Sequence, residues 1–271
     1  GIPFCPARCL YCSFTSNQAG ESEITEYLEA LKKEIAAVGR RFSDLGVSVE
    51  SVYFGGGTPS LLSADAIARM LDTVAERCTV SQDAEITLEA NPLTLTDAML
   101  CALREAGINR LSIGIQSFQP EVLAVLGRAH TPQQGYEAVL RAHAAGFENL
   151  SLDLMIGLSL QNEDVLHADI ETAVSLPVQH ISAYLLRIEE HTPFGENPPH
   201  MLDDDNMAER YQQLHAELAV HGFSHYEISN FARTGYASRH NCKYWRCEPY
   251  YAVGPAAHGC VRSEEQRLNS S

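Results

Sequence analysis

Three cysteines near the start of the chain carry the clearest chemical signal in the sequence. Cys5, Cys9 and Cys12 follow one another on one short segment in the pattern C-x3-C-x2-C. Three thiolates on a tight loop can hold three irons of a [4Fe-4S] cluster, which usually takes four cysteines, and one iron is then open to a substrate or cofactor. A zinc site completed by a distant Cys or His is the alternative, although zinc motifs favour paired cysteines.

A run of glycines after an expected strand is the second chemical signal. Residues 55–59 read G-G-G-T-P and directly follow the β-rich run 51–54. Glycines at such a turn allow the backbone to approach a ligand closely, so that its N–H and C=O groups can bind an ammonium or carboxylate group. A tight strand-to-helix corner with no ligand is the alternative.

Polar side chains close several of the strands that follow. Glu89 and Gln116 end two apolar runs, Arg128 follows soon after the second, and Asp153 interrupts the apolar run 152–155. Because the carboxyl ends of parallel strands meet at one face, we expect these side chains to line one site. Asp153 needs a partner among its apolar neighbours, for which we expect a ribose or an arginine. A capping role for Glu89 and a purely structural pair for Asp153 are the alternatives.

The cysteine triplet resembles the signature of the radical S-adenosylmethionine (SAM) superfamily. In that family the open iron of a [4Fe-4S] cluster binds the amino and carboxylate groups of SAM, and the reduced cluster cleaves the sulfonium. By this resemblance Cys5, Cys9 and Cys12 hold the cluster. The residues that the resemblance implies as SAM contacts are Tyr11, Gly56, Gly57, Thr58, Glu89, Gln116, Arg128, Asp153 and, as a weaker match, Ala183.

The elements that would position these residues alternate along the chain. Apolar spacing and turn residues predict strands at 51–54, 85–89, 110–115, 150–156 and 180–186, and helices at 24–41, 64–77, 97–106, 131–145 and 163–175. Strand then helix, repeated about six times, is typical of parallel βαβ units. Because polar residues recur at the strand ends, we predict an α/β fold, a partial (β/α)6, TIM-like radical SAM barrel.

The alternation stops after residue 187, where prolines mark a loop. A helix at 207–221, introduced by the acidic residues 203–205, and a strand at 224–228 follow. The stretch 230–259 is rich in Gly, aromatic residues and His, and we expect it to be a loop-built appendage over the barrel. The predicted division is a barrel core, residues 1–190, and a C-terminal α+β appendage, residues 191–271. Both ends of the sequence look cut, and we expect an excerpt of a longer protein.

Within the superfamily, the whole chain resembles the branch of oxygen-independent coproporphyrinogen III oxidase (HemN) and its haem-chaperone relatives of the HemW type. The oxidase pattern has a further Cys two positions after the triplet, where this chain has Phe14, as the chaperones do. Residues 240–245, H-N-C-K-Y-W, match the H-N-x-x-Y-W motif of the chaperones. The appendage would then begin the C-terminal region of these proteins, and we expect that region to be truncated here.

The resemblance implies a haem chaperone that binds a [4Fe-4S] cluster, SAM and haem, and delivers haem as cargo to client haemoproteins. His240 and Tyr244 are its candidate haem ligands. The alternative for His240 is a structural role in pinning the appendage to the barrel. An electron donor such as flavodoxin or ferredoxin is a further implied partner, and a homodimer is left open.

Two other functions compete with the haem chaperone. One is the oxidase itself, which converts coproporphyrinogen III to protoporphyrinogen IX by radical oxidative decarboxylation. Phe14, in the place of the oxidase's extra Cys, argues against that activity, so whether the chain is an enzyme stays open. The other is a barrel whose cluster is only structural, which the polar residues at successive strand ends argue against.

The composition excludes several classes of protein. The chain has 271 residues with 19 Lys and Arg against 35 Asp and Glu, a formal charge of −16, which argues against a nucleic-acid partner. Its apolar runs are too short for a membrane span, and its first residues do not resemble a signal peptide, so we expect a cytoplasmic protein. Five of its eight cysteines are expected to be free thiols: Cys78, Cys101, Cys242, Cys247 and Cys260.

Overall fold

A curled seven-stranded sheet forms the centre of the molecule, in the order β1-β2-β3-β4-β5-β7-β6. The structure is a computed structural model that describes residues 1–260, except for the side chain of Ser43. Residues 261–271, the last part of the expected appendage, lie outside the described residues. The strands are β1 Ser48–Phe54, β2 Thr79–Ala90, β3 Arg110–Gln116, β4 Leu150–Ile156, β5 His180–Leu185, β6 Ser224–Glu227 and β7 Asn230–Ala232.

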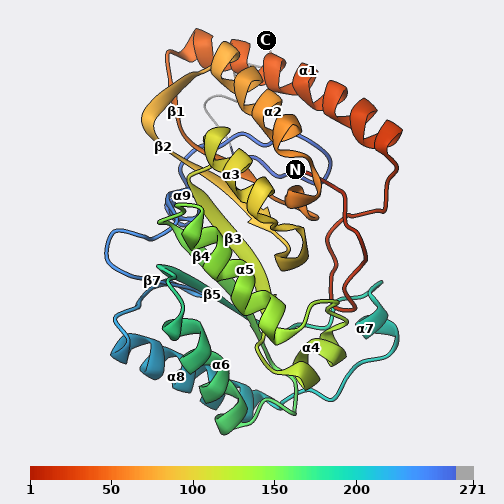
Figure 1. The fold of residues 1–271 in the computed structure, drawn as a ribbon, viewed down its shortest axis with the longest axis vertical. Coiled ribbons are helices and arrows are strands. Elements are labelled where there is room, and N and C mark those ends of the chain that lie inside the picture. The colour runs from red at the N-terminus through yellow and green to blue at the C-terminus, as the bar shows by residue number, and fades with distance from the viewer. Residues whose placement is uncertain (261–271) are drawn as a thin grey trace.

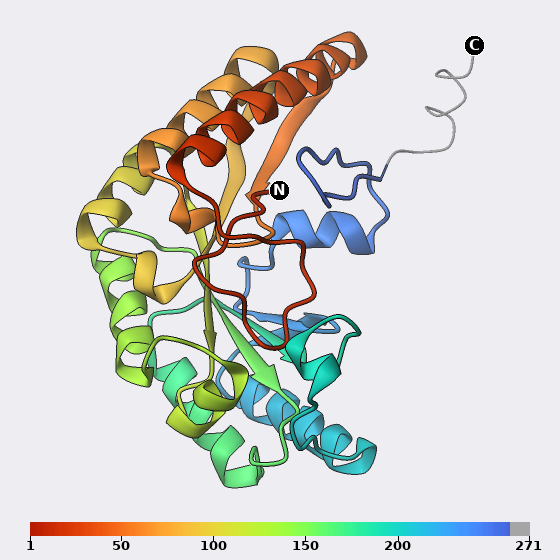
Figure 2. The ribbon, with the colours of Figure 1, turned by 90° about the vertical axis from the view of Figure 1, so that its right-hand side faces the viewer.

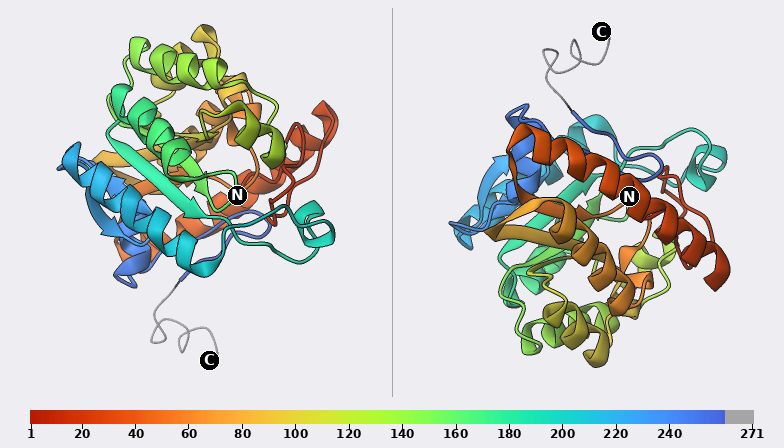
Figure 3. Two further views of the ribbon diagram at one scale, coloured as in Figure 1. Left: turned by 90° about the horizontal axis from the view of Figure 1, so that it is seen from below. Right: turned by 90° about the horizontal axis from the view of Figure 1, so that it is seen from above.

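The main helices of the repeating units cover the convex face of the sheet, whereas the N-terminal loop and the last part of the described chain, with α9, lie on the concave side (Figures 1 and 2). Views from the two ends show α1 and α2 stacked at one end of the sheet and α6 and α8 at the other (Figure 3). The helices are α1 Glu21–Leu45, α2 Ala64–Arg77, α3 Asp97–Glu105, α4 Pro120–Leu126, α5 Pro132–Ala144, α6 Glu163–Ser175, α7 Pro193–Glu196, α8 Asp204–Val220 and α9 Arg239–Trp245, with short 3-10 turns at Pro59–Leu61 and Pro92–Thr94.

The predicted partial barrel is confirmed, and its sixth unit differs from the simple repeat. Strands β1 to β5 are parallel, whereas β7 runs antiparallel to β5 and β6 antiparallel to β7. Only two residues separate β6 from β7, and a connection this short produces an antiparallel pair, because parallel strands need a longer crossover. The strands of the expected appendage therefore continue the sheet of the core.

Alternation along the strands separates a hydrophobic core from a polar interior. On β3, Leu111, Ile113 and Ile115 are fully buried in the main hydrophobic cluster beneath the helices. Arg110 and Ser112 alternate with them and therefore lie on the concave face. The curled sheet thus places its polar side chains on the inside of the partial barrel.

Local signals explain where several of the helices begin. The hydroxyl of Ser63 accepts a hydrogen bond from the Ala66 N–H and caps α2, as expected. Thr131 and Gln134 form a capping box at the start of α5. Asp203 caps α8, which begins three residues earlier than predicted because the neighbouring acidic residues form its first turn.

Four helices and strands were not predicted. The short helix α4 follows β3, α7 lies where prolines were expected to mark a loop, and β7 and α9 lie in the stretch 230–259 that was expected to be loop-built. Their three to seven residues are too few to give a clear apolar period. Within residues 1–260, no helix combines the length and the apolar composition that crossing a membrane requires.

Candidate cofactor site at the barrel mouth

The segment before the cysteine triplet is fixed against the glycine turn. Ile2 and Phe4 are buried, and the chain around them pairs with residues 55–58. The Ile2 N–H donates to the Gly55 carbonyl oxygen (2.8 Å), the Gly57 N–H to the Ile2 carbonyl oxygen (2.8 Å), and the Thr58 N–H to the Phe4 carbonyl oxygen (2.7 Å). The glycine turn thus holds the start of the cysteine loop directly beside the end of β1.

Two of the glycines in this turn are required by the chain itself. Gly56 has φ +115°, a conformation that favours glycine, and a Cβ at Gly57 would lie 2.6 Å from the Phe4 carbonyl oxygen. The close approach that the sequence predicted therefore exists, but its partner in this structure is the N-terminal segment. Because Gly57 already uses its N–H, any ligand contact at this residue involves another of its atoms.

The three thiols of the triplet are free and partly buried. The Cys5 sulfur lies 3.4 Å from the Thr58 hydroxyl oxygen, and the Arg128 guanidinium donates to the Cys9 sulfur (3.2 Å). Burial raises the pKa of the Cys12 thiol, and the neighbouring thiols Cys9 and Cys5 raise it further. Within residues 1–260, no group of three or more His, Cys, Asp or Glu side chains is arranged closely enough to hold a metal ion. The three thiols therefore do not form a ready site for a single metal ion in this structure.

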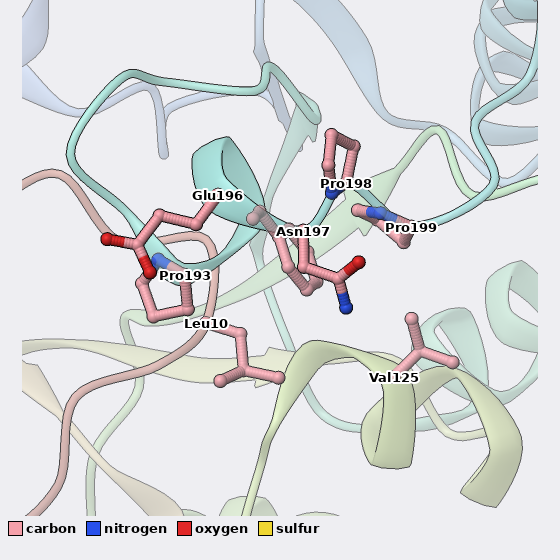
Figure 4. Close-up of a pocket in the computed structure, with 8 residues that line it drawn as sticks. Leu10, Val125, Pro193, Glu196, Asn197, Pro198 and Pro199 are labelled. Atoms are coloured by element: carbon pink, nitrogen blue, oxygen red, sulfur yellow. The ribbon is translucent and has the colours of Figure 1, made fainter.

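The cysteine loop is held from its other side by α4 and α7. The Leu10 N–H donates to the Leu126 carbonyl oxygen (3.4 Å), and the Leu10 carbonyl oxygen accepts from the Phe194 N–H (3.0 Å). Burial raises the pKa of Tyr11, whose ring centroid lies 6.5 Å from that of Phe194. A cavity of about 450 Å³ lies here, lined by Leu10, Val125, Pro193, Phe194, Glu196, Asn197, Pro198 and Pro199. Figure 4 shows these side chains.

Glu89 lies beside the glycine turn, at the end of β2. Its carboxylate accepts hydrogen bonds from the Tyr53 hydroxyl (2.8 Å) and from the Gly56 N–H (3.1 Å). Burial raises the pKa of this carboxyl group to about 7. A group that titrates near neutral pH on a strand end fits the sequence prediction of a site residue better than that of a surface cap.

Gln116, at the end of β3, is held in an unusual backbone conformation. Its φ is +72°, and its buried Oε1 has no hydrogen-bond partner among the described residues. The loop that follows is fixed by Asp169 of α6, whose carboxylate accepts from the Ser117 hydroxyl (2.6 Å) and the Phe118 N–H (2.7 Å). A strained residue with an unpaired amide oxygen is what a ligand-binding position at the mouth would present.

Asp153 has a polar partner, as its apolar surroundings require. Its carboxylate accepts from the Ser112 hydroxyl on the neighbouring strand (3.1 Å). Burial raises the pKa of Asp153 to about 6, although hydrogen bonds from Ser112 and Ser182 and the charges of Arg110 and Arg128 act in the opposite direction. The expected arginine is thus an electrostatic neighbour, and the direct partners are hydroxyl groups.

The side chain of Ala183 does not point toward the inside of the partial barrel. Ala183 is paired with Leu154 on β4, and both residues are 1% exposed. The preceding pair, Asp153 and Ser182, lies on the concave face. The Ala183 N–H donates to the Ser229 carbonyl oxygen (2.7 Å). The structure therefore gathers the other predicted SAM residues around the mouth and leaves the Ala183 side chain on the helix side of the sheet.

Both ring nitrogens of His240 have partners in the structure. Nδ1 lies 2.9 Å from the Ser51 hydroxyl oxygen, and Nε2 lies 2.7 Å from the Tyr244 hydroxyl oxygen. The ring stacks on Tyr53, with centroids 4.9 Å apart, and burial lowers the pKa of His240 to about 4. This arrangement pins α9 to β1, and through Tyr53 it connects the appendage with Glu89.

Several site residues were missed from the sequence, among them Tyr53, Ser112 and Asp169. Tyr53 and Ser112 lie on the same concave face as Glu89 and Asp153. Counting every second residue along the neighbouring strands would have identified both positions. Asp169 is 2% exposed and stands on the apolar face of α6 next to Ile170. A carboxylate on an apolar helix face needs hydrogen-bond partners, so the position of Asp169 in the sequence could have indicated a structural role.

Comparison with known proteins agrees with this geometry. The family model described as the Radical SAM superfamily matches residues 1–173. Heme chaperone HemW of Escherichia coli (strain K12) is 39% identical over 98% of this chain and 70% of its own length. Heme chaperone HemW of Bacillus subtilis (strain 168) is 38% identical over 96% of this chain and 69% of its own length.

Solved structures show the same fold. Coproporphyrinogen III oxidase (HemN) from Escherichia coli superposes with a TM-score of 0.80 over 96% of this chain and 63% of its own, at 22% identity. The archaeal Elp3 of Methanocaldococcus infernus gives a TM-score of 0.57 over 73% of this chain and 52% of its own, at 14% identity. At these identities the likeness concerns the fold alone.

Proposed function

Because the chain belongs to the radical SAM superfamily, we propose that it is a haem chaperone of the HemW type, which binds haem and delivers it to client haemoproteins. The observation that carries the proposal is the 36–39% identity to proteins named heme chaperone HemW over nearly the whole chain. Phe14, in the position of the oxidase's extra cysteine, supports the same choice and is 67% exposed.

The residues at the barrel mouth fit a cluster and SAM. Cys5, Cys9 and Cys12 are the thiol donors for the cluster, which would leave one iron for the cofactor. The unpaired Gln116 amide oxygen and the Glu89 carboxylate can accept hydrogen bonds from SAM's ammonium or hydroxyl groups. When bound, the two groups together supply one-electron chemistry at the sulfonium.

Haem is proposed to bind at the appendage rather than inside the mouth. Tyr244 and Trp245 on α9 are 43% and 54% exposed, and aromatic rings of this kind can pack on a porphyrin face. His240 can act as a ligand only after one of its two hydrogen bonds is broken, and the bond to Tyr244 is the more exposed of the two. Client haemoproteins and an electron donor of the flavodoxin or ferredoxin type complete the proposal.

A cytoplasmic location is part of the same proposal. All eight cysteines, which lie within residues 1–260, are free thiols. Free thiols are typical of compartments in which glutathione and thioredoxin keep cysteines reduced.

The proposal is tested by measuring haem binding and coproporphyrinogen III turnover in parallel on protein with an anaerobically reconstituted cluster. We expect stable haem binding and no release of carbon dioxide. Decarboxylation at rates typical of enzymes, on the order of 1 per second, would replace the chaperone with the oxidase.

Variants separate the cluster from the haem site. Cys9→Ala should lose the four-iron spectrum and keep haem binding. His240→Ala together with Tyr244→Phe should weaken haem binding at least tenfold, whereas His143→Ala, at an exposed position on α5, should leave it unchanged. Equal haem affinity in all these proteins would move the haem site away from α9.

A further inference from the structure

The ring of His240 packs against the strand that leads into the glycine turn. Residues 51 and 53 of β1 point to the same face of the sheet, and both contact this ring. The Ser51 hydroxyl oxygen lies 2.9 Å from its Nδ1, and the Tyr53 ring stacks on it, with centroids 4.9 Å and planes 22° apart. The appendage therefore touches the side chain of Tyr53 directly.

Tyr53 in turn contacts two parts of the candidate SAM site. Its hydroxyl donates to Glu89 Oε1 (2.8 Å), while Glu89 Oε2 accepts from the Gly56 N–H (3.1 Å). A Cβ at Gly55 would lie 2.9 Å from Tyr53 Cε1 and 3.1 Å from Glu89 Oε2, so the phenol ring, the carboxylate and the turn are in close contact. Because of these contacts, the position of the Tyr53 ring determines where the Glu89 carboxylate is held.

The backbone of α9 is held by other contacts than the His240 ring. Glu85 of β2 accepts from the Arg239 and His240 N–H groups (3.1 Å each). The Lys243 Nζ lies 2.6 Å from a carboxylate oxygen of Glu50 on β1. We therefore expect the helix to stay in place when only the ring is removed, so that the effect of the ring on Tyr53 can be measured by itself.

We propose that His240 is a positioning residue of the SAM site: stacked on Tyr53, its ring fixes the hydroxyl group that orients the Glu89 carboxylate. The inference rests on the proposed function in that it takes SAM as the ligand of the barrel mouth. It gives His240 a role that does not require haem. A carboxylate that is already held in one position loses less conformational freedom when a ligand binds, so the ligand binds more tightly.

The direct test is a double-mutant cycle on SAM binding in the absence of haem. Equilibrium dialysis of the protein with a reconstituted cluster is done at pH 8, because burial raises the pKa of Glu89 to about 7 and the ionised form is the acceptor. We expect His240→Ala to weaken SAM binding about fivefold or more, and His240→Phe, whose ring can keep the stacking, to stay within about twofold of the unaltered protein. When Tyr53→Phe has already removed the hydroxyl, adding His240→Ala should change SAM binding by less than about twofold.

Lys243→Ala is the matched control for this cycle. It removes another contact between α9 and β1 and leaves the side chain of Tyr53 untouched, so SAM binding should stay within about twofold of the unaltered protein. If Lys243→Ala weakens SAM binding as much as His240→Ala does, the ring only holds the appendage in place and the proposal is wrong. The same conclusion follows if His240→Ala has an equal effect with and without the Tyr53 hydroxyl.

A second measurement needs no cofactor. The Gly56 N–H donates to Glu89, so its hydrogen exchange in the apo-protein, followed by NMR, reports how firmly the carboxylate is held. We expect this exchange to become at least about threefold faster in His240→Ala and in Tyr53→Phe, and to stay unchanged in His240→Phe and Lys243→Ala. The amides of β4 should keep their protection in all four variants. If His240→Ala loses that protection, His240→Gln, which also lacks an aromatic ring, takes its place.

The two measurements separate this inference from the proposed function. An unaltered protein that carries a four-iron cluster and never binds SAM would contradict the proposed function, and the exchange of the Gly56 amide would still decide the role of His240. SAM binding together with equal Gly56 exchange in the unaltered protein and His240→Ala would contradict only the role of His240.

Discussion

At the scale of single residues, the same side chains and backbone groups serve both the fold and the candidate site. The Glu89 carboxylate accepts hydrogen bonds from the Tyr53 hydroxyl and from the Gly56 N–H of the glycine turn, and these bonds fix its position. Burial raises the pKa of the same carboxyl group to about 7. Gly57 is required because the N-terminal segment passes too close for any Cβ. Residues proposed to bind the cofactor are therefore also residues that hold the cysteine loop in place.

Gly57→Ala should displace the cysteine loop without unfolding the barrel. The added Cβ would lie 2.6 Å from the Phe4 carbonyl oxygen and 3.0 Å from that of Ile2, so the segment before Cys5 has to move. We expect iron incorporation on anaerobic reconstitution to fall at least fivefold, measured as iron and sulfide per chain. Gly20→Ala, where a Cβ meets nothing within 4 Å, is the control and should reconstitute normally. Equal iron content in both variants would mean that the loop position does not limit cluster binding.

At the scale of elements, neighbouring helices fix the loops at the mouth. The carboxylate of Asp169 on α6 accepts three hydrogen bonds from the loop after β3, from Ser117, Phe118 and Gln119. Gln116, in its positive-φ conformation, is the residue directly before this loop. The strain at Gln116 is thus maintained by a helix one unit further along the chain.

Asp169→Ala should destabilise the protein and weaken SAM binding together. Removing the carboxylate leaves buried donors unpaired, and we expect a loss of about 2–4 kcal/mol in the free energy of unfolding. The conformation of Gln116 should relax, and SAM binding should fall at least tenfold in the fraction of protein that remains folded. Urea unfolding and equilibrium dialysis measure the two effects. Thr172→Ala, on the same helix, is the control and should change stability by less than about 1 kcal/mol.

A buried carboxylate holds the start of the appendage helix α9. Glu85 of β2 accepts hydrogen bonds from the Arg239 and His240 N–H groups (3.1 Å each) and lies 3.4 Å from the Ser238 hydroxyl oxygen. These N–H groups have no partner within the helix, because they belong to its first turn. Glu85 therefore joins the appendage to the core near the bottom of the barrel.

Glu85→Ala should release α9 while the barrel stays folded. Hydrogen exchange of the amides at residues 238–245 should become at least tenfold faster, and the amides of β3 and β4 should keep their protection, since local opening and global unfolding are separate events. Haem affinity should fall in parallel if the haem site is on α9. Uniformly faster exchange over the whole chain would show that Glu85 supports the core and not the helix.

At the scale of the whole molecule, the helices and strands that were predicted correctly are those with a regular spacing of apolar residues. Strand β4 and helices α2 and α6 have the predicted boundaries because apolar spacing and caps agree there. Arg110 could not be identified as a buried charge, since its position at the start of an apolar strand is equally compatible with exposure. The pairing of the N-terminal segment with residues 55–58 and the stacking of His240 on Tyr53 join residues far apart in the chain, and no local pattern indicates such contacts.

The long-range contacts of the appendage should make the stability of the whole molecule sensitive to acid. Burial lowers the pKa of His240 to about 4, compared with about 6.5 in the unfolded chain, so the unfolded state binds more protons than the folded state between these pH values. The contribution of His240 to stability is therefore complete above pH 6.5 and is lost as the pH falls toward 4. Glu89 and Asp153, whose folded pKa values are raised, act in the opposite direction in the same range, so the effect of His240 has to be measured by difference.

His240→Phe isolates this contribution, because phenylalanine can keep the stacking on Tyr53 but cannot take up a proton. We expect the free energy of unfolding of this variant to change less between pH 6.5 and 4.5 than that of the unaltered protein, with a difference on the order of 2 kcal/mol from the shift in pKa. Urea unfolding at several pH values measures both curves, and His143→Phe on the exposed face of α5 supplies the control. Parallel curves for the unaltered protein and His240→Phe would mean that folding does not lower the pKa of His240, and α9 would then have to be more open to solvent than its contacts with Ser51 and Tyr53 indicate.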